Sequence, residues 1–257
     1  KGSGSYKAVA EIPHAFLAMS TPVTQKMWVD VMGYNPSYFK EGPSSKKTIV
    51  GGKLIVLQPD HPVENLTWWS ALVFANALSA KYGLVPAYDL DEIVFKHIHS
   101  VGTPKPILDA TIFSDAAMGN LEANDPYLLP KLNGEGFRLP TELEQEYLLR
   151  AAGKFDTQYH FGDSESQLDH YAWYAKNSEG TTHPVAELNP IVIDGNSFFD
   201  VIGNVGEWSS SKPASSVYLK GTGWRGQADS LKSERRNSEV PQRRYNYIGF
   251  RLVRTLK

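Results

Sequence analysis

The chain has 257 residues, of which 41% are hydrophobic and 12% aromatic, which is sufficient for a buried core and excludes a disordered protein. Its formal net charge of −2 argues against general nucleic-acid binding. The sequence contains no cysteine, which excludes disulfides, thiolate metal sites and cysteine catalysis.

The N-terminal stretch carries little structural signal. The chain begins at Lys1 rather than at a methionine, so we expect that it has been processed or trimmed and that any signal peptide has been removed. Residues 1–7, KGSGSYK, are predicted to be a flexible leader. No apolar run reaches 18 residues, so no transmembrane segment is predicted.

Two helices are predicted in the first third of the chain. Residues 24–33, TQKMWVDVMG, begin with Thr24 as an N-cap and end at Gly33. Residues 67–83 form a longer helix with Thr67 as its cap and an end at glycine. Its apolar residues recur at helical spacing: Trp68, Leu72, Ala75, Leu78 and Tyr82.

A third helix is predicted for residues 141–153, TELEQEYLLRAAG. Thr141 and Glu144 have the spacing of a capping box, in which each side chain bonds to the other residue's amide. We expect one apolar face and an end at Gly153. The expected face consists of Leu143, Tyr147 and Ala151.

The remaining sequence is typical of short strands joined by long loops. Residues 183–188, HPVAEL, and 247–254, YIGFRLVR, are predicted strands. Residues 91–133 have mixed composition and weak periodicity, which indicates an insertion with a short helix at 112–121. No repeat or linker divides the chain, so we predict one α+β domain over residues 1–257.

The last part of the chain is unusually basic. Residues 212–257 contain eight more basic than acidic side chains, although the whole chain is slightly acidic. Two interpretations remain open at this point. These residues form a patch for a polyanion, or the arginines serve as structural hydrogen-bond donors.

Six motifs occur in one order: VTQKMWVDVMGYNPSYF, HPVENLTWWSALVFANALSAKYGL, GFRLPTELEQEYLLRAAG, YAWYAKNSEGTTHPVAELNP, FFDVIGNVGEW and KGTGW with GFRLV. In this order they resemble the formylglycine-generating enzyme (sulfatase-modifying factor) family over residues 15–254, apart from the insertion. The resemblance implies a variant of the C-type-lectin fold with little regular secondary structure.

The same resemblance argues against the enzymatic activity. In the enzymes, two cysteines of the C-terminal segment bind copper, and here their positions are Gly226 and Leu231. The soft thiolate pair that copper(I) requires is therefore missing, and we reject formylglycine generation. A related branch holds iron with three histidines, but its extra helical bundle is missing here. His97 and His99 lie in the insertion and are too few for a metal site.

A third branch with this fold, the variable proteins of diversity-generating retroelements, ends on the same segment and implies a ligand-binding role without catalysis. In that branch, residues between fixed framework positions vary and form the binding surface. The corresponding residues here are mostly polar or tyrosine, which suits a binding surface. They are Arg225, Gly226, Gln227, Asp229, Ser230, Arg235, Asn237, Ser238, Glu239, Gln242, Arg243, Tyr245, Asn246 and Tyr247.

The framework positions are expected to fix the backbone of this segment. They are Gly221, Trp224, Ala228, Arg236, Pro241, Arg244 and Phe250. Trp208, Trp224 and Phe250 have the chemistry of ligand platforms, but we expect all three to be buried framework. Side chains such as Tyr245 and Tyr247 are expected to point outward and to contribute little to folding.

A structural calcium site is implied at FFDVIGNVGEW. Its ligands would be the side chains of Asp200 and Glu207 and the carbonyls of Gly203 and Val205, which are the hard oxygen ligands that calcium prefers. In the alternative interpretation, Asn204 and Glu207 only satisfy backbone amides in a tight turn. A hydrolase with paired carboxylates is a poorer interpretation, because no specificity determinant accompanies the pair.

We therefore predict a non-enzymatic binding protein whose ligand, a protein or another surface molecule, binds at the C-terminal segment. No cofactor is expected apart from the calcium ion, and we expect a monomer. The resemblance also implies export to a bacterial cell surface through a lipid anchor upstream of Lys1. The alternatives are an enzyme or accessory factor that modifies a peptide on the same scaffold, and a purely structural paralogue.

Overall fold

The computed structural model describes residues 12–88, 90, 134–211 and 216–256. Several predicted features lie outside the described residues, namely the leader 1–7, the insertion 91–133 with its helix at 112–121, and the pair His97 and His99.

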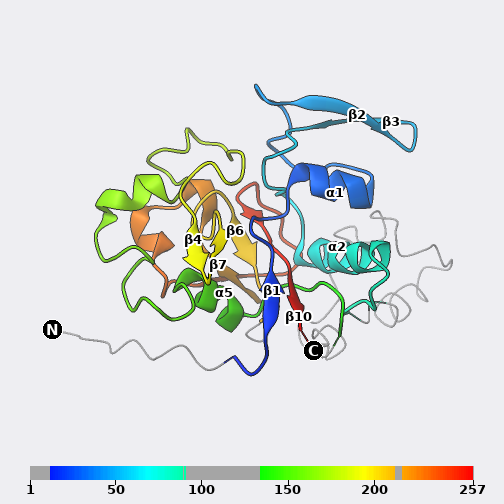
Figure 1. The fold of residues 1–257 in the computed structure, drawn as a ribbon. Helices are drawn as coiled ribbons and strands as arrows, with labels where there is room; N and C mark the ends of the chain where they lie inside the picture. The colour runs from blue at the N-terminus through cyan, green and yellow to red at the C-terminus, as the bar shows by residue number, and fades with distance from the viewer. Residues whose placement is uncertain (1–11, 89, 91–133, 212–215, 257) are drawn as a thin grey trace.

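The two ends of the described chain meet in a small sheet (Figure 1). Strand β1, Phe16–Ala18, pairs antiparallel with β10, Val253–Thr255, and Phe16 lies opposite Thr255. This pairing ties the residues that follow the N-terminal leader to the residues that follow the C-terminal segment.

A four-stranded sheet carries the C-terminal segment. Its strand order is β8-β7-β6-β9. Strands β6 and β9 are parallel, whereas the other neighbours are antiparallel. The strands are β6, Gly206–Trp208; β7, Val217–Lys220; β8, Asn237–Glu239; and β9, Ile248–Gly249.

In the described residues, two hairpins and three short 3₁₀ helices accompany these sheets. The hairpins are β2, Lys46–Val50, with β3, Lys53–Leu57, and β4, Ile191–Ile193, with β5, Asn196–Phe198. The 3₁₀ helices are η2, Glu165–His170; η3, Gly223–Arg225; and η4, Ala228–Leu231.

The first two predicted helices are confirmed. Helix α1, Gln25–Met32, begins where Thr24 Oγ1 accepts from the Met27 amide at 3.2 Å, and Gly33 with φ 74° ends it. Helix α2, Trp68–Lys81, is capped in the same way by Thr67. Tyr82 was expected on the buried face but is 67% exposed, because the helix ends one residue before it.

Helix α5, Glu142–Leu149, confirms the predicted cap but not the predicted face or end. Both hydrogen bonds of the capping box between Thr141 and Glu144 are present. The helix ends at Leu149, because Ala151 and Ala152 take left-handed φ values of 49° and 62°. Leu143 is 42% exposed, and the buried residues are instead Glu144, Gln145, Leu148 and Leu149.

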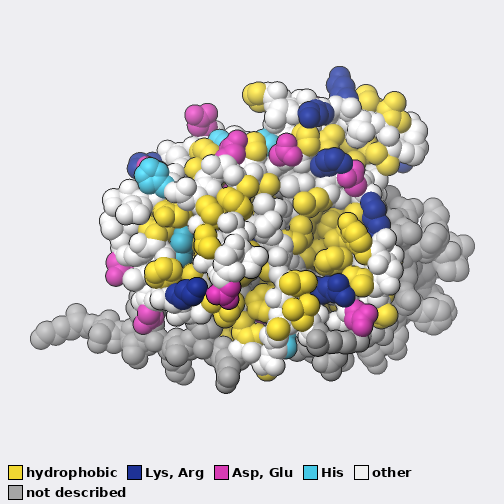
Figure 2. Space-filling model, viewed as in Figure 1, with side chains coloured by type: hydrophobic (Ala, Val, Ile, Leu, Met, Phe, Trp, Pro, Cys, Tyr) yellow, Lys and Arg dark blue, Asp and Glu magenta, His cyan; other side chains and the backbone are white. Residues whose placement is uncertain are grey.

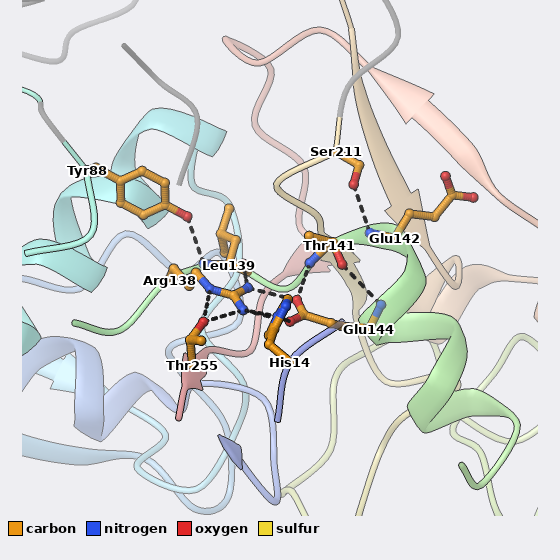
Figure 3. A network of polar contacts seen from close by, with 9 residues as sticks. All are labelled: His14, Tyr88, Arg138, Leu139, Thr141, Glu142, Glu144, Ser211 and Thr255. Carbon is orange, nitrogen blue, oxygen red and sulfur yellow. Dashed lines mark hydrogen bonds and ion pairs between the residues drawn. The ribbon is translucent and has the colours of Figure 1, made fainter. Parts of the chain in front are cut away.

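The buried face of α5 follows from an ion pair inside the protein (Figure 3). Arg138 donates to both carboxylate oxygens of Glu144, at 2.6 and 2.8 Å, and both side chains are 1% exposed. Burial opposes ionisation of Glu144, but the hydrogen bonds and charge of Arg138, with the Thr141 amide, lower its pKa. Thr255 of β10 also accepts from Arg138, so the pair joins α5 to the last strand.

The predicted strands are confirmed only in part. Residues 247–254 contain β9 and the start of β10. Residues 183–188 form no strand, and this prediction is wrong: Ala186 takes a φ of 65° and its amide is bound by the Asp200 carboxylate. An apolar hexapeptide between turns cannot by itself be distinguished from a buried loop, because periodicity needs a longer run.

The main hydrophobic core lies between the helices α1 and α2 and the C-terminal strands. Trp28 stacks on Phe74 with ring centroids 5.2 Å apart, and Phe250 meets both rings edge-on at 6.1 and 5.5 Å. Phe250 and Trp28 are 0% exposed. Phe250, which directly follows β9, is therefore anchored by the helices α1 and α2.

Candidate ligand-binding surface

The C-terminal segment is fixed to the four-stranded sheet at both of its ends. It leaves the sheet at β7, forms η3 and η4, returns as the edge strand β8 and re-enters at β9. In β8, Asn237 lies opposite Leu219, so part of the predicted binding segment is a strand rather than a loop. The backbone is thus held at several points along its length.

Gly223 sets the first turn of the segment. Its φ is 65°, and an added Cβ would lie 2.7 Å from the Tyr247 carbonyl oxygen and 3.0 Å from that of Asn204. Only glycine fits such a close approach of three backbone segments. The start and the end of the C-terminal segment are therefore in contact here.

Trp224 differs from the expectation of a buried framework residue. Trp208 and Phe250 are 0% exposed, as predicted, but Trp224 is half-buried. Its indole nitrogen donates to the Asn246 carbonyl at 2.9 Å, and its backbone amide donates to Asn204 at 2.8 Å. The ring is therefore rigidly held and still reaches the surface.

Most of the predicted ligand residues present side chains to solvent. The exposed ones are Arg225, Gln227, Asp229, Arg235, Asn237, Ser238 and Arg243. The half-buried ones are Ser230, Glu239, Gln242, Tyr245, Asn246 and Tyr247. The framework residues Arg236 and Arg244 are also exposed, whereas Pro241 is buried.

Gly226 was predicted to belong to the binding surface, and this is wrong. It is buried, and an added Cβ would lie 1.8 Å from Thr222 Oγ1. Its carbonyl accepts from the Ala175 amide at 3.0 Å. Gly226 is part of the framework, because a side chain there would meet Thr222 and Ser230 of the same segment.

Tyr245 and Tyr247 contribute more to packing than expected. Both are half-buried and pack against the main core, with ring centroids 4.9 Å apart. The Arg225 guanidinium lies 4.3 Å above the Tyr247 ring, a cation–π contact. Burial raises the pKa of both phenols, although neighbouring Arg225 lowers that of Tyr247. The expectation that they point outward is therefore wrong, and their small contribution to folding stays a prediction.

Two aromatic residues from the first part of the chain extend this surface. Phe39 meets the Trp224 ring edge-on at 5.6 Å, and Tyr38, which is 66% exposed, meets Phe39 at 5.0 Å. Together with the two tyrosines they form a group that we call the aromatic surface: Tyr38, Phe39, Trp224, Tyr245 and Tyr247. The sequence motif NPSYF contained the first two, but it gave no reason to place them beside the C-terminal segment.

A buried carboxylate holds the loop that carries Tyr38 and Phe39. Glu64 is 0% exposed and accepts from the amides of Tyr38 and Phe39 at 3.1 and 2.9 Å. Burial raises the pKa of Glu64 to about 8, and the two amide hydrogen bonds oppose this shift. The next residue, Asn65, donates its amide to the Tyr245 carbonyl, so residues 64–65 connect both halves of the aromatic surface.

The basic residues of the segment are used largely as structural donors, which was one of the two interpretations. Arg236 pairs with Glu142 at 3.0 Å and lies 4.9 Å from the Tyr218 ring. Lys220 is 4% exposed, and its ammonium lies 3.7 Å from Glu146. Burial lowers the pKa of Lys220, and the charges of Glu146 and Glu142 oppose this shift.

The two positions that hold copper ligands in the enzymes are closed. Gly226 has no room for a side chain, and Leu231 is 1% exposed inside a second hydrophobic cluster with Tyr159 and Leu168. Among the described residues, no group of three or more His, Asp or Glu side chains could hold a metal ion. The packing thus agrees with the loss of the thiolate pair.

The predicted calcium turn has oxygen donors that fit the ion, but the Arg251 guanidinium already binds one of the predicted ligands, Glu207. Arg251 donates to both oxygens of Glu207 at 2.8 and 2.9 Å, and to the Asp200 carbonyl at 3.1 Å. The Asp200 carboxylate accepts from the amide of Ala186 and the side chain of Asn204. The guanidinium therefore pairs with the Glu207 carboxylate, and the Asp200 carboxylate is held by neutral donors.

Burial, and to a smaller extent the charge of Glu207, raise the pKa of Asp200. A divalent cation would offset both effects, so the chemistry of the donors fits calcium, and the site stays a prediction. In the alternative interpretation, Asn204 satisfies backbone groups, and it does so at His183. Glu207 instead pairs with Arg251.

A cavity lies away from the C-terminal segment, between β1, α5 and the β4–β5 hairpin. Its volume is about 810 Å³. The lining is mainly apolar, with Phe16, Ile193 and Phe198, and its ionisable side chains are His14, Tyr147 and Asp194. We place the candidate site on the C-terminal segment, because that surface combines aromatic and hydrogen-bonding side chains on a fixed backbone.

The helices in the described part of the chain are too short or too polar to cross a bilayer.

Comparison with solved structures agrees with this arrangement. Treponema denticola variable protein 1 is 29% identical, with a TM-score of 0.74 over 99% of this chain and 91% of that chain. CarF is 24% identical, with a TM-score of 0.57 over 94% of this chain and 87% of that chain. PvdO from Pseudomonas aeruginosa is 17% identical, with a TM-score of 0.55 over 95% and 93%. The last two share the fold.

A curated relative, the chaperone protein LppX of Paenibacillus barcinonensis, is 29% identical over 203 residues, which are 72% of this chain. The match spans 58% of the length of that relative. The model of the sulfatase-modifying factor enzyme 1-like domain matches residues 7–256. The predicted α+β fold of the formylglycine-generating enzyme type is confirmed, and the chain belongs to the sulfatase-modifying factor enzyme 1-like domain family.

Proposed function

We propose that this protein is a non-enzymatic binding protein and that its ligand binds the aromatic surface and the exposed residues of the C-terminal segment. One observation carries the proposal. The backbone of the segment is anchored by buried residues such as Gly223, Leu231 and Phe250, while side chains between them such as Arg225, Gln227 and Asn237 reach solvent. A fixed backbone with adaptable side chains is the usual arrangement of a binding loop.

The chemistry of the surface suits a peptide or protein ligand. Tyr38 and the half-buried Trp224 offer large contact area at little cost in side-chain entropy. The exposed Arg225, Gln227 and Asn237 of the C-terminal segment supply both hydrogen-bond donors and acceptors. Aromatic and arginine side chains are those that most often dominate binding energy at protein interfaces.

The absence of catalysis is also part of the proposal. The sequence has no cysteine, and Gly226 and Leu231 stand where the enzymes of the family have copper ligands. The similarity to a variable protein, at 29% identity, supports a binding role. The relative named as a chaperone is compatible with it, because a chaperone acts by binding another protein.

We further propose that the segment varies through a diversity-generating retroelement and that the protein is displayed on a cell surface. The residues expected to vary include Arg225, Asn237 and Tyr247, whose types are reached from adenine-rich codons. The test is the gene neighbourhood. A reverse transcriptase gene and a near-identical repeat of the segment, differing at adenines, would support the proposal, and their absence would contradict it.

Binding can be tested with a random peptide library displayed on phage and selected on the immobilised chain. Peptides that are enriched are then measured by biolayer interferometry against a variant with five exposed surface residues replaced by alanine. These residues are Arg225, Gln227, Arg235, Ser238 and Arg243. We expect at least a tenfold loss of affinity, which corresponds to about 1.4 kcal/mol.

A matched control variant has five exposed residues of similar chemistry outside the segment replaced by alanine: Lys26, Ser45, Lys81, Lys154 and Asn196. It should bind the selected peptides as the parent does. Equal binding by the first variant would place the site elsewhere. Equal losses in both variants would mean that the peptides recognise the protein nonspecifically, and this would contradict the proposal as well.

A further inference from the structure

The β2–β3 hairpin projects beyond α1 (Figure 1). Gly51 and Gly52 form its tip with φ values of 55° and 78°, as in the tight two-residue turns that fit the twist of a hairpin. Lys46 pairs with Leu57 at the base, and Val50 pairs with Lys53 next to the turn. The register is therefore defined over the whole hairpin.

The inner face of the hairpin accounts for its attachment to the protein. Ile55 and Leu57 are 7% and 4% exposed and pack against Val29 of α1. The amide of Asn35 donates to the Val56 carbonyl at 3.0 Å, which holds the second strand near the body. A two-stranded sheet needs such support, because a free hairpin is only marginally stable in water.

The outer face is apolar as well, although it lies in solvent. Ile49 and Leu54 are directly opposite each other and are 71% and 63% exposed. Alternation along the strands places half-buried Val56 and exposed Lys47 on the same face. An antiparallel sheet with one solvated face normally carries polar side chains there. The exposed aliphatic pair near the turn of the hairpin therefore indicates a surface that binds another molecule or a membrane.

The charge of the hairpin indicates the nature of that partner. Residues 46–57 contain Lys46, Lys47 and Lys53 and no acidic residue. All three lysines are exposed, and no ion pair joins them to another residue in the described part of the chain. In Figure 2 the hydrophobic side chains over the hairpin are bordered by basic ones.

We propose that the β2–β3 hairpin docks on an anionic lipid surface. Ile49 and Leu54 enter the boundary between headgroups and acyl chains. Lys47, which shares their face, contacts the lipid phosphates, and the exposed Lys46 and Lys53 add positive charge from the other face of the hairpin. Aliphatic side chains framed by basic ones are the arrangement that binds such interfaces. A second copy of the chain is a poor partner for this face, because it would bring the same positive charges together.

The proposal is tested by sedimentation of the purified chain with vesicles. The vesicles contain phosphatidylcholine with 30% phosphatidylglycerol, or phosphatidylcholine alone, at low and at physiological salt. We expect binding to the anionic vesicles that weakens with salt, and little binding to the neutral ones. Each lysine near such a surface contributes about 1 kcal/mol, so replacing all three by glutamine should lower partitioning about 100-fold.

The aliphatic pair is tested separately with the variant Ile49→Ser/Leu54→Ser, which should lower partitioning about 10-fold or more. The control is Val192→Ser, which changes a 52% exposed aliphatic residue of the β4–β5 hairpin and should bind as the parent does. Circular dichroism checks that each variant is folded. Because all replaced side chains are exposed, we expect unchanged spectra.

A reporter distinguishes insertion from adhesion by charge alone. The variant Ile49→Trp should shift its fluorescence emission to the blue when anionic vesicles are added, and Trp at the control position 192 should not. No binding by the parent, or equal binding by the serine variant, would overturn the proposal. A concentration-dependent dimer that the serine variant abolishes would assign the face to a second copy instead, and it would overturn the proposal too.

Discussion

The structure makes a quantitative prediction about the division between framework and surface in the C-terminal segment. Phe250 is 0% exposed and touches the rings of Trp28 and Phe74. Truncating such a phenylalanine to alanine costs about 3–5 kcal/mol, because the transfer free energy is lost and a cavity remains. In a chain of this size each kcal/mol lowers the melting temperature by about 2–4 °C. Phe250→Ala should therefore melt about 6–20 °C below the parent.

The five surface residues used in the binding experiment should behave differently. Arg225 loses a cation–π contact with Tyr247, and Arg235 loses an exposed ion pair with Asp229. Each of these contacts contributes about 0.5 kcal/mol, and the other three positions contribute close to nothing. Replacement of all five should therefore cost about 1 kcal/mol, or about 2–4 °C.

Differential scanning calorimetry of the parent, the five-residue variant and Phe250→Ala measures this contrast. If the five-residue variant melts as low as Phe250→Ala, the exposed residues are part of the core energetics, and the division of labour is refuted. The two tyrosines, Tyr245 and Tyr247, are left unchanged for this reason, because they pack against the core.

Three further predictions follow from particular sites. The purified chain should not convert cysteine to formylglycine in a sulfatase peptide, because Gly226 and Leu231 replace the copper ligands. A conversion product detected by mass spectrometry would contradict this prediction. One calcium ion should bind at millimolar concentration in calorimetry. Asp200→Asn should abolish this binding, because asparagine tolerates the backbone φ of 50° but lacks the negative charge. If the parent gives no heat of binding, the site is refuted. Burial lowers the pKa of His160 to about 4, so the unfolded chain takes up a proton first below pH 6.5 and stability falls towards pH 4. Between pH 7 and pH 5, the free energy of unfolding measured in urea should therefore fall by about 2 kcal/mol less in His160→Phe than in the parent. An equal fall in both proteins would refute the lowered pKa of His160.

The sequence determined the local features of the fold. Thr24, Thr67 and Thr141 cap the three helices because a hydroxyl oxygen bonds an amide three residues on, and this geometry needs nothing from the rest of the chain. Likewise, Gly33 ends its helix through its own left-handed backbone. The replacement of the two copper ligands of the enzymes by Gly226 and Leu231 followed from residue types alone.

Tertiary structure decided which faces are buried. In α5 the periodicity favoured Leu143, yet Glu144 is buried in its place because Arg138 and Thr255 supply the partners for its carboxylate. A hydrophobicity scale places a glutamate at the surface. Glu144 is buried nevertheless, because it pairs with Arg138, which also bonds to Thr255 from a distant part of the sequence.

The same holds for the candidate site. The segment and its exposed side chains were predicted from the sequence, but Tyr38 and Phe39 were not, because Glu64 and Asn65 bring them beside Trp224 from the other end of the chain. Gly226 looked like its variable neighbours in the sequence and is excluded from the surface only by Thr222. Local patterns report what a residue does with its neighbours in the chain. Contacts between distant segments depend on how the whole core packs, and that packing is not written in any single window of sequence.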